Sequence, residues 1–404
     1  MSPRWSRVAR RFLSAMRDDA TGASRSVPDG PATLYGTCYG LLARHYLGET
    51  VAVSDAVRDF IQNGQDAETG WFVGPELRDF QAPPGALHDR EHLRMHLTCA
   101  ALPACRQFGV PLRHPLTAAA RFCDLDSLRA WLAARDLRRA WLEGNNLLFA
   151  GQLLVHLRDV AGDPRAAAAL DVWFEWLERH LDPRTSLWGT DGACGLAEGV
   201  YGGYHQLLIY SHERRPIRNP HGLVDAVLSL QHADGGFLPQ GNAGACEDVD
   251  GVDILVHRYK QEDYRRRDIR MALRKCLDHI LAQQNTDGGF PYTRNRPQHH
   301  MGVPGTVAPP NASTMFPTWF RIHTLALMAE VLTDDPRLAS VPFRFSDTPS
   351  MGWHRTWDKS AHALSAAETR AERMELRRWK FDHAAQRTKD ALWDFAQRLR
   401  ARRA

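Results

Sequence analysis

Helical periodicity dominates the pattern of hydrophobic and polar residues along the chain, and sustained strand-like alternation is missing. The helical segments fall into two sets. One set carries little charge toward its start, so we expect it to be buried on most sides; it comprises residues 33–47, 93–108, 145–157, 200–210, 250–259 and 316–332. The other set is amphipathic and comprises residues 54–62, 127–137, 166–181, 220–231, 267–284 and a sixth helix drawn from one of the termini.

A glycine turn recurs between the two kinds of helix. The pattern Gln-x-x-Asp-Gly-Gly-Phe occurs at residues 231–237 and again at 284–290, and weaker copies occur at 65–72 and 182–189. The glycines allow a positive φ where the outer helix reverses, and the phenylalanine fills the groove between helices. Such repeats are typical of stacked helical hairpins. The sequence therefore predicts an all-α fold, an (α/α)6 toroid with six inner and six outer helices around a central cavity.

The repeat pattern ends near residue 345. We therefore expect one toroid domain over residues 1–345 and a basic helical extension over residues 346–404 that packs on it. The extension contains a long charged helix, rich in arginine, over residues 361–404. The alternative position for this helix is the surface of an anionic membrane.

Composition narrows the class of protein. Of the 404 residues, 44% are hydrophobic and 24% are charged, which is ordinary for a globular chain with a large core. The formal charge is only +4 and the arginine excess lies mainly at the two ends, which argues against a nucleic-acid partner. The seven cysteines are scattered and indicate neither a disulfide framework nor a zinc ribbon. We expect a cytoplasmic protein, or one that is peripheral to the membrane.

The candidate chemistry lies near the starts of the inner helices, which face the mouth of the central cavity. Its sharpest feature is a run of four acids, to which we assign catalysis: Glu247, Asp248, Asp250 and Asp253. Helix capping accounts for one or two of these carboxylates, but close like charges raise one another's pKa unless a cation or a shared proton intervenes. One of them is therefore a candidate proton donor, and the alternative is helix capping together with a structural ion pair to a nearby arginine. Candidate substrate-binding residues on the same ring are Tyr35, Tyr39, His96, Asn145, Asn146, Tyr204, His205 and Trp319.

The Gln-x-x-Asp-Gly-Gly-aromatic turns, with an acidic motif opening the next inner helix, resemble those of terpenoid cyclases and protein prenyltransferase β subunits, which share the α-α toroid. Asp248-Val249-Asp250 is similar to the first part of the Asp-x-Asp-Asp acid of class II cyclases, and this match makes Asp250 the proton donor. The next acid of that motif is replaced by Gly251 here. Asp250-Gly251-Val252 also resembles the Asp-Gly-Cys segment of the prenyltransferase zinc site, but valine replaces the cysteine, so zinc-dependent prenylation is not expected.

A second resemblance leads to carbohydrates. Toroid polysaccharide lyases use an asparagine to neutralise a uronate carboxylate, and a tyrosine and a histidine to move the proton. Residues 141–146 and 201–205 resemble such sites and supply Asn145, Tyr204 and His205. The alternative interpretation of these segments is a close approach of helices at glycine, with a buried hydrogen-bond network.

Two further features bear on ligands. The basic loop over residues 293–302 is a candidate lid, in which Arg294 and Arg296 suit an anionic group. Histidines recur every four residues from His88 to His96, but about 12 Å of helix separates the outer two, so the three do not share one metal ion. A histidine pair with a residue from another helix is the alternative, and we assign no metal ligands.

The leading prediction of function is a terpenoid cyclase-like or prenyltransferase-like enzyme. It would act on an isoprenoid or similar lipid-like substrate by acid-initiated, class II-like chemistry, with aromatic side chains stabilising cations. No cofactor is required in this scheme, and Mg²⁺ held by the same acids is the variant. The alternatives are a carbohydrate-active toroid (a lyase, hydrolase or epimerase) and a non-catalytic repeat protein that binds a partner.

Overall fold

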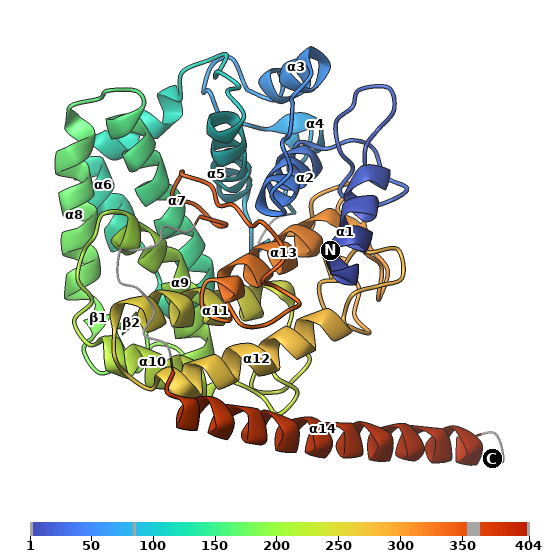
Figure 1. The fold of residues 1–404 in the computed structure, drawn as a ribbon. Helices are drawn as coiled ribbons and strands as arrows, with labels where there is room; N and C mark the ends of the chain where they lie inside the picture. The colour runs from blue at the N-terminus through green and yellow to red at the C-terminus, as the bar shows by residue number, and fades with distance from the viewer. Residues whose placement is uncertain (1–2, 84–85, 354–363, 402–404) are drawn as a thin grey trace.

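The structure, a computed structural model, describes residues 3–83, 86–353 and 364–401, with the side chains of the last helix given to residue 385. It is mostly helical, as predicted (Figure 1). The low-charge helices are α2 (Leu34–Tyr46), α5 (Arg90–Gln107), α7 (Ala140–Asp159), α9 (Leu196–His212), α11 (Ala245–Gln261) and α13 (Met315–Ala329). The amphipathic helices are α1 (Arg4–Ala15), α3 (Asp55–Asn63), α6 (Leu125–Ala133), α8 (Arg165–Arg179), α10 (Pro220–Ser229) and α12 (Arg266–Ala282).

Shorter elements connect these helices. They are α4 (Gly74–Leu77), the 3-10 helices η1 (Thr117–Cys123) and η2 (Leu137–Arg139), and two antiparallel pairs of short strands, β1 (Leu181–Asp182) with β2 (Leu187–Trp188) and β3 (Gln298–His299) with β4 (Val307–Ala308). In the register of these pairs, Leu181 lies opposite Trp188 and Gln298 opposite Ala308. Their length explains why no strand pattern is visible in the sequence.

The low-charge helices contact one another in a closed order. Helix α2 contacts α5, α5 contacts α7, α7 contacts α9, α9 contacts α11, α11 contacts α13, and α13 returns to α2. Five of the amphipathic helices pack against this series: α1 and α3 on α2, α8 on α7, α10 on α9 and α11, and α12 on α11 and α13. The sixth, α6, contacts α8 and η1. The hydrophobic core lies between the two sets and includes fully buried Trp173, Trp188 and Trp319.

The repeated turns join neighbouring units, which is the structural role predicted for them. Gly235 and Gly288 have φ angles of 97° and 98°. A Cβ added there would lie 2.4 and 2.0 Å from a backbone oxygen of α12 and α1, respectively. The side chain of Gln231 donates to the carbonyl oxygens of Gly235 and of Ala272 in α12, at 2.9 and 2.8 Å. Gln284 makes the matching pair of bonds to its own turn and to α1.

The chain after residue 345 has two parts. Residues 346–353 lie in the helical body, where the carbonyl of Gly352 accepts the hydroxyl of Tyr46 at 2.6 Å and Trp353 is buried beside His212 and His257. The long helix α14 (Ala366–Ala401) contacts α12 and runs past the edge of the body (Figure 1). Residues 361–363 and 402–404 of the expected terminal helix lie outside the described residues. Among the described helices, none is long and apolar enough to cross a bilayer.

Candidate functional site

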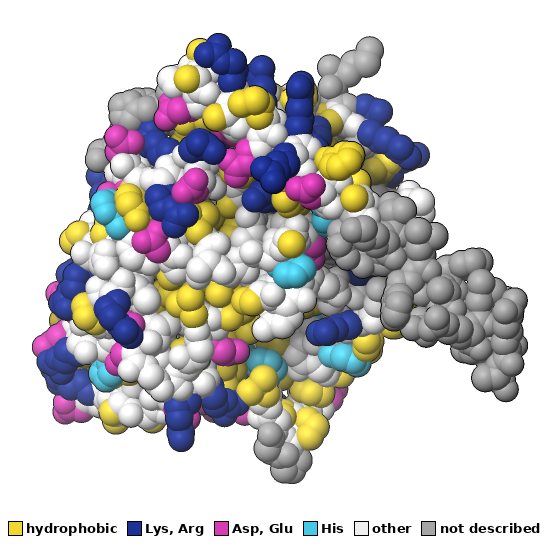
Figure 2. Space-filling model, turned by 90° about the horizontal axis from the view of Figure 1, so that it is seen from below, with side chains coloured by type: hydrophobic (Ala, Val, Ile, Leu, Met, Phe, Trp, Pro, Cys, Tyr) yellow, Lys and Arg dark blue, Asp and Glu magenta, His cyan; other side chains and the backbone are white. Residues whose placement is uncertain are grey.

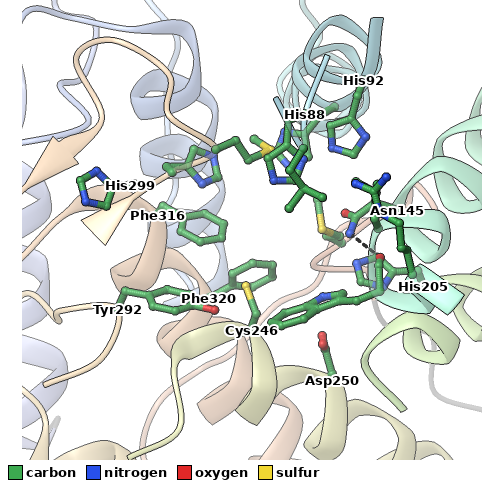
Figure 3. A pocket seen from close by; sticks show the side chains of 18 of the residues that line it. His88, His92, Asn145, His205, Cys246, Asp250, Tyr292, His299, Phe316 and Phe320 are labelled. Carbon is green, nitrogen blue, oxygen red and sulfur yellow. Dashed lines mark hydrogen bonds between the residues drawn. The ribbon is translucent and has the colours of Figure 1, made fainter. Parts of the chain in front are cut away.

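A cavity of about 770 Å³ lies at the N-terminal ends of five of the low-charge helices. The helix residues that line it are His92 and His96 of α5, Trp141, Leu142 and Asn145 of α7, Glu198 and His205 of α9, Cys246 and Asp250 of α11, and Phe316 and Phe320 of α13. The remaining wall is formed by Leu87, His88, Arg138, Arg139, Tyr292, residues 297–301 and Met351. Figure 3 shows Asn145 and His205 on one side and Tyr292, Phe316 and Phe320 on the other, with Asp250 and Cys246 between them.

The lining residues repeat with a spacing of four on several helices. Residues four apart in sequence lie on the same face of an α-helix, so each helix presents two successive turns to the cavity. The pairs are His92 and His96, Trp141 and Asn145, Cys246 and Asp250, and Phe316 and Phe320.

Of the four acids in the 247–253 motif, Asp250 is the one that lines the cavity. It is 1% exposed, and its Oδ2 has no hydrogen-bond partner among the described residues. Burial raises the pKa of its carboxyl well above the ordinary value, and the neighbouring acids Glu247, Asp253 and Asp248 raise it further. This shift favours the protonated form of Asp250, which is the form that a general acid requires.

The three other acids of the motif do not line the cavity. Glu247 lies behind the wall and accepts the hydroxyl of Tyr292 at 2.9 Å. Asp253 is buried and pairs with His257 at 3.0 Å. Each of these two acids is thus held by a neighbouring side chain, Glu247 by Tyr292 and Asp253 by His257.

Asp248 has a structural partner on each side. Its Oδ1 accepts the backbone N–H of Phe237, which follows the glycine turn, at 2.9 Å, and its Oδ2 pairs with the buried guanidinium of Arg321. Thr98 and Thr318 accept the equivalent N–H groups of Phe72 and Phe290 in other units. Asp248 therefore occupies a position that secures the turn in three of the four repeats.

Neutral imidazoles form much of the opposite wall. Burial is the largest cause that lowers the pKa of His92 and His96, and it lowers that of His205 to about 4 and that of His300 to about 3. The rings of His96 and His300 have centroids 5.5 Å apart. These side chains are uncharged at neutral pH and present acceptor or donor nitrogens without adding positive charge.

Hydrogen bonds fix how the polar side chains face the cavity. His205 Nδ1 lies 2.7 Å from the carbonyl oxygen of Tyr201, which places the ring proton on Nδ1 and leaves Nε2 as an acceptor. Asn145 donates one Nδ2 hydrogen to the carbonyl of Trp141 at 3.0 Å and retains a second. On the neighbouring helix, His92 Nδ1 lies 2.9 Å from Oδ1 of Asn146.

The predicted substrate-binding residues divide into two groups. His96, Asn145 and His205 line the cavity together with Asp250. The others lie behind the wall or away from it: the hydroxyl of Tyr35 is 2.8 Å from Nδ1 of His96, Asn146 holds His92, Tyr39 stacks on Trp319 at 4.2 Å, and Tyr204 packs beside His205. They support the lining residues and do not reach the cavity.

The loop over residues 293–302 contributes its histidines rather than its arginines. His299 and His300 line the cavity with Met301. Arg294 turns away and donates to the side chain of Asn285 at 2.7 Å and to a backbone carbonyl, while Arg296 is exposed outside the cavity lining. The predicted anion contacts of these two arginines are therefore not made inside the cavity.

Three lining residues were missed in the sequence because the helices that carry them were predicted to begin too late. The predicted helix starts for α7, α9 and α11 fell about one turn late, so Trp141, Glu198 and Cys246 lay outside the expected inner helices. The four-residue spacing from Asn145 and Asp250 was the signal that would have found Trp141 and Cys246. Met351 comes from the far end of the chain, and no local pattern marks it.

A cation site is not preformed here. Within the described part of the chain, no group of three or more His, Cys, Asp or Glu side chains is arranged to hold a metal ion. The cavity brings together the carboxyl group of Asp250, several imidazoles, the amide of Asn145 and two arginines. Arg138 and Arg139 are exposed there, and the charge of Arg139 contributes to lowering the pKa of His88.

Comparison with known proteins leaves the site to be interpreted from its own geometry. No protein-family model matches the chain, and no curated protein matches it. Among solved structures, a polysaccharide lyase is similar with a TM-score of 0.43 and 11% sequence identity, over 81% of this chain and 96% of that chain. A similarity of this size carries no argument about fold or function.

Proposed function

We propose that the described helices form an (α/α)6 toroid, the fold that terpenoid cyclases and prenyltransferase β subunits share. The closed order of contacts from α2 through α13 supports an inner ring, and the amphipathic helices packed against it support an outer one. The glutamine and glycine contacts of the repeated turns support the division into units. The cavity at the N-terminal ends of the ring is where such a fold binds ligands.

We propose that the protein is a carbohydrate-active enzyme that performs acid–base chemistry on an anionic sugar, with β-elimination on a uronate-containing glycan as the reaction. One observation carries this proposal: Asp250, whose pKa is raised, and several neutral imidazoles face the same cavity, which Arg139 also lines. Elimination needs a protein base and a protein acid that both reach the bound substrate, and a group that binds the carboxylate of the uronate.

Each role has a candidate. Nε2 of His205 takes the proton on the carbon next to the uronate carboxylate, while Asn145 and Arg139 hold that carboxylate and stabilise the developing negative charge. Asp250 donates its proton to the glycosidic oxygen as the carbon–oxygen bond breaks. A carbon–carbon double bond forms, and solvent then moves the proton from His205 to Asp250.

The same groups suit hydrocarbon cyclisation less well. Protonation of an alkene requires a strong acid, whereas burial and three neighbouring acids make Asp250 a weak one. Neutral imidazoles are also bases, and those of His96, His205 and His300 would remove protons from a carbocation in the cavity. For these reasons the carbohydrate alternative fits the lining better than the terpenoid prediction.

Purified protein incubated with a panel of uronate-containing glycans tests the proposal. Unsaturated products, detected by ultraviolet absorbance and mass spectrometry, are expected from the wild type. Asp250→Asn and His205→Asn each remove one proton-transfer group and should lower kcat by about 10²–10⁴-fold. Asp171→Asn, an exposed change on α8, is the matched control. Wild-type activity in Asp250→Asn and His205→Asn would refute the assigned roles.

A class II-like terpenoid reaction is the second candidate because protonated Asp250 shares the cavity with Phe316, Phe320 and Tyr292, whose ring faces stabilise cations. Incubation with prenyl diphosphates and squalene-like polyenes tests it. Cyclised products that disappear in Asp250→Asn, with no activity on any glycan, would replace the first proposal with this one.

A further inference from the structure

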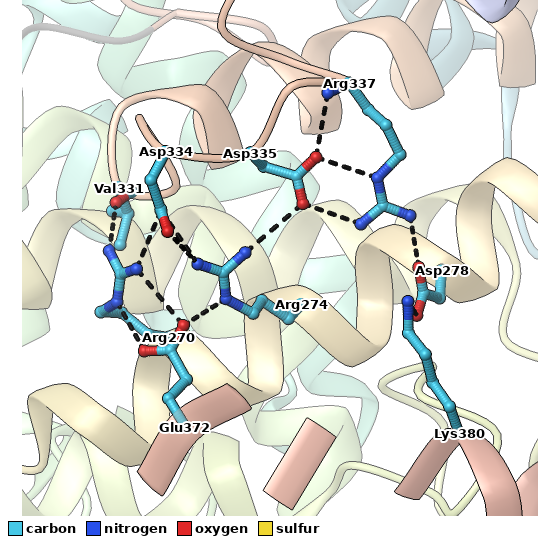
Figure 4. A network of polar contacts seen from close by, with 9 residues as sticks. All are labelled: Arg270, Arg274, Asp278, Val331, Asp334, Asp335, Arg337, Glu372 and Lys380. Carbon is cyan, nitrogen blue, oxygen red and sulfur yellow. Dashed lines mark hydrogen bonds and ion pairs between the residues drawn. The ribbon is translucent and has the colours of Figure 1, made fainter. Parts of the chain in front are cut away.

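The terminal helix α14 is anchored on the body by its acidic side. Glu372, 1% exposed, receives the guanidinium groups of Arg270 and Arg274 from α12, with Arg270 Nε at 2.8 Å (Figure 4). Asp334 neutralises both arginines from the other side. Because charges buried this way are costly to separate, the network fixes which face of α14 points inward.

Further contacts extend the anchor along the helix. Glu375 pairs with Arg267 at 2.6 Å, and the indole Nε1 of Trp379 donates to the carbonyl of Ala233 at 3.0 Å. Lys380 pairs with Asp278 at 2.9 Å. The first turns of α14 are thus held in one orientation, while the helix continues beyond the body (Figure 1).

The outward side of the same turns is apolar and basic. Met374 and Phe381 are 66% and 75% exposed, the largest exposures among the large hydrophobic side chains of the described residues. Arg377 and Arg378 lie three or four residues from both, so the four share one helix face, and both arginines are exposed. Arg378 has only a 3.9 Å pair with exposed Asp382, which contributes little. The sequence continues with Leu392 and Leu399 among further basic residues.

We propose that this face of α14, defined by Met374, Arg377, Arg378 and Phe381, binds the surface of an anionic lipid bilayer. Transfer of exposed Phe and Met side chains from water into the interface between headgroups and acyl chains is favourable, and flanking arginines attract anionic headgroups. A nucleic acid would satisfy the arginines but leave Met374 and Phe381 in water. On the side of the body seen from below, basic and acidic side chains are interspersed (Figure 2).

Vesicle flotation of the full chain tests the proposal, with vesicles of phosphatidylcholine alone and of phosphatidylcholine with phosphatidylglycerol. The chain should float with the anionic vesicles, remain largely unbound to the neutral ones, and be released as salt rises. Arg377→Gln/Arg378→Gln should weaken the partition by about 25-fold, since each basic residue near the surface contributes about fivefold. Met374→Ser/Phe381→Ser should weaken it as well.

Val160→Ser is the matched control, because Val160 is 55% exposed on α7's C-terminal end and away from α14. Its partition should equal that of the wild type, and circular dichroism should show equal helix content in all variants. Equal binding to neutral and anionic vesicles, or wild-type binding by the Arg377/Arg378 variant, would overturn the proposal. So would light scattering that shows a dimer converted to a monomer by Met374→Ser/Phe381→Ser, because a second copy would then cover this face.

Discussion

The buried ion pair between Arg321 and Asp248 gives a stability prediction that does not depend on the reaction. Both side chains are fully buried. Arg321 also donates to the carbonyl of Ala243 at 3.1 Å, and Asp248 accepts the N–H of Phe237. The change Arg321→Leu leaves the carboxylate buried without its main partner, which costs about 3–5 kcal/mol in the free energy of unfolding.

The equivalent positions in other repeats suggest a second substitution that should offset the loss of Arg321. Thr98 and Thr318 use a hydroxyl where Asp248 uses a carboxylate, at 2.9 and 3.0 Å from the accepted N–H. Asp248→Thr therefore keeps the hydrogen bond while it removes the charge. The double variant Asp248→Thr/Arg321→Leu should be more stable than Arg321→Leu alone by about 2 kcal/mol, although it carries one more substitution.

Circular dichroism during thermal unfolding gives the Tm of each variant, and urea unfolding gives the free energy of unfolding. For a chain of 404 residues, the typical unfolding entropy gives a shift of roughly 1 °C in Tm for each kcal/mol. Arg321→Leu should therefore lower Tm by about 4–6 °C, and the double variant should recover about 2 °C of that loss. If the double variant is as unstable as the sum of the two single variants, the two side chains are not coupled and the reasoning fails.

Three further predictions concern the turns and the cavity. Gly235→Ala should cost at least about 2 kcal/mol, because φ is 97° and an added Cβ would lie 2.4 Å from the backbone of α12; Gly109→Ala, with φ of 63° and open space around it, should cost about 1 kcal/mol. The pKa of His205 is lowered to about 4 and that of His300 to about 3 by burial, so the unfolded state binds protons more readily. The stability that these two histidines contribute should therefore be lost as the pH drops from about 6.5 toward 4, and urea unfolding should show a smaller loss over this range for His300→Gln than for the wild type. Met351→Trp should fill the end of the cavity and raise KM for long substrates more than for short ones; an equal effect on both would place Met351 away from the bound chain.

The helices could be located from the hydrophobic periodicity because each is either buried on most sides or amphipathic along its whole length. All six low-charge segments, and the five amphipathic segments for which residue ranges were predicted, overlap with helices of the structure. Helix starts were harder to locate, since the first turn of α7 or α11 contains residues that also suit a loop. Glycine turns were predictable as well, because the positive φ they require leaves a local mark in the sequence.

The candidate site was only partly predictable because its walls come from distant parts of the chain. Asp250, His96, Asn145 and His205 lie on expected helices and line the cavity. Met351 reaches it through a segment that enters the body after α13, and such a position depends on long-range packing that no local pattern encodes.

The acid cluster shows why proximity in sequence does not define a site. Successive residues of an α-helix point about 100° apart, so the acids of one helical segment diverge. Asp250 shares the cavity face with Cys246, whereas Asp248, two residues earlier, points toward Arg321 and the turn before the helix. Asp248 is paired with the guanidinium of Arg321, whereas Asp250 has no such partner among the described residues. Burial raises the pKa of Asp250, and the nearby acids Glu247, Asp253 and Asp248 raise it further although they lie off the cavity face. Asp248 thus contributes both to the turn before the helix and to the protonated form of Asp250 that the proposed reaction requires.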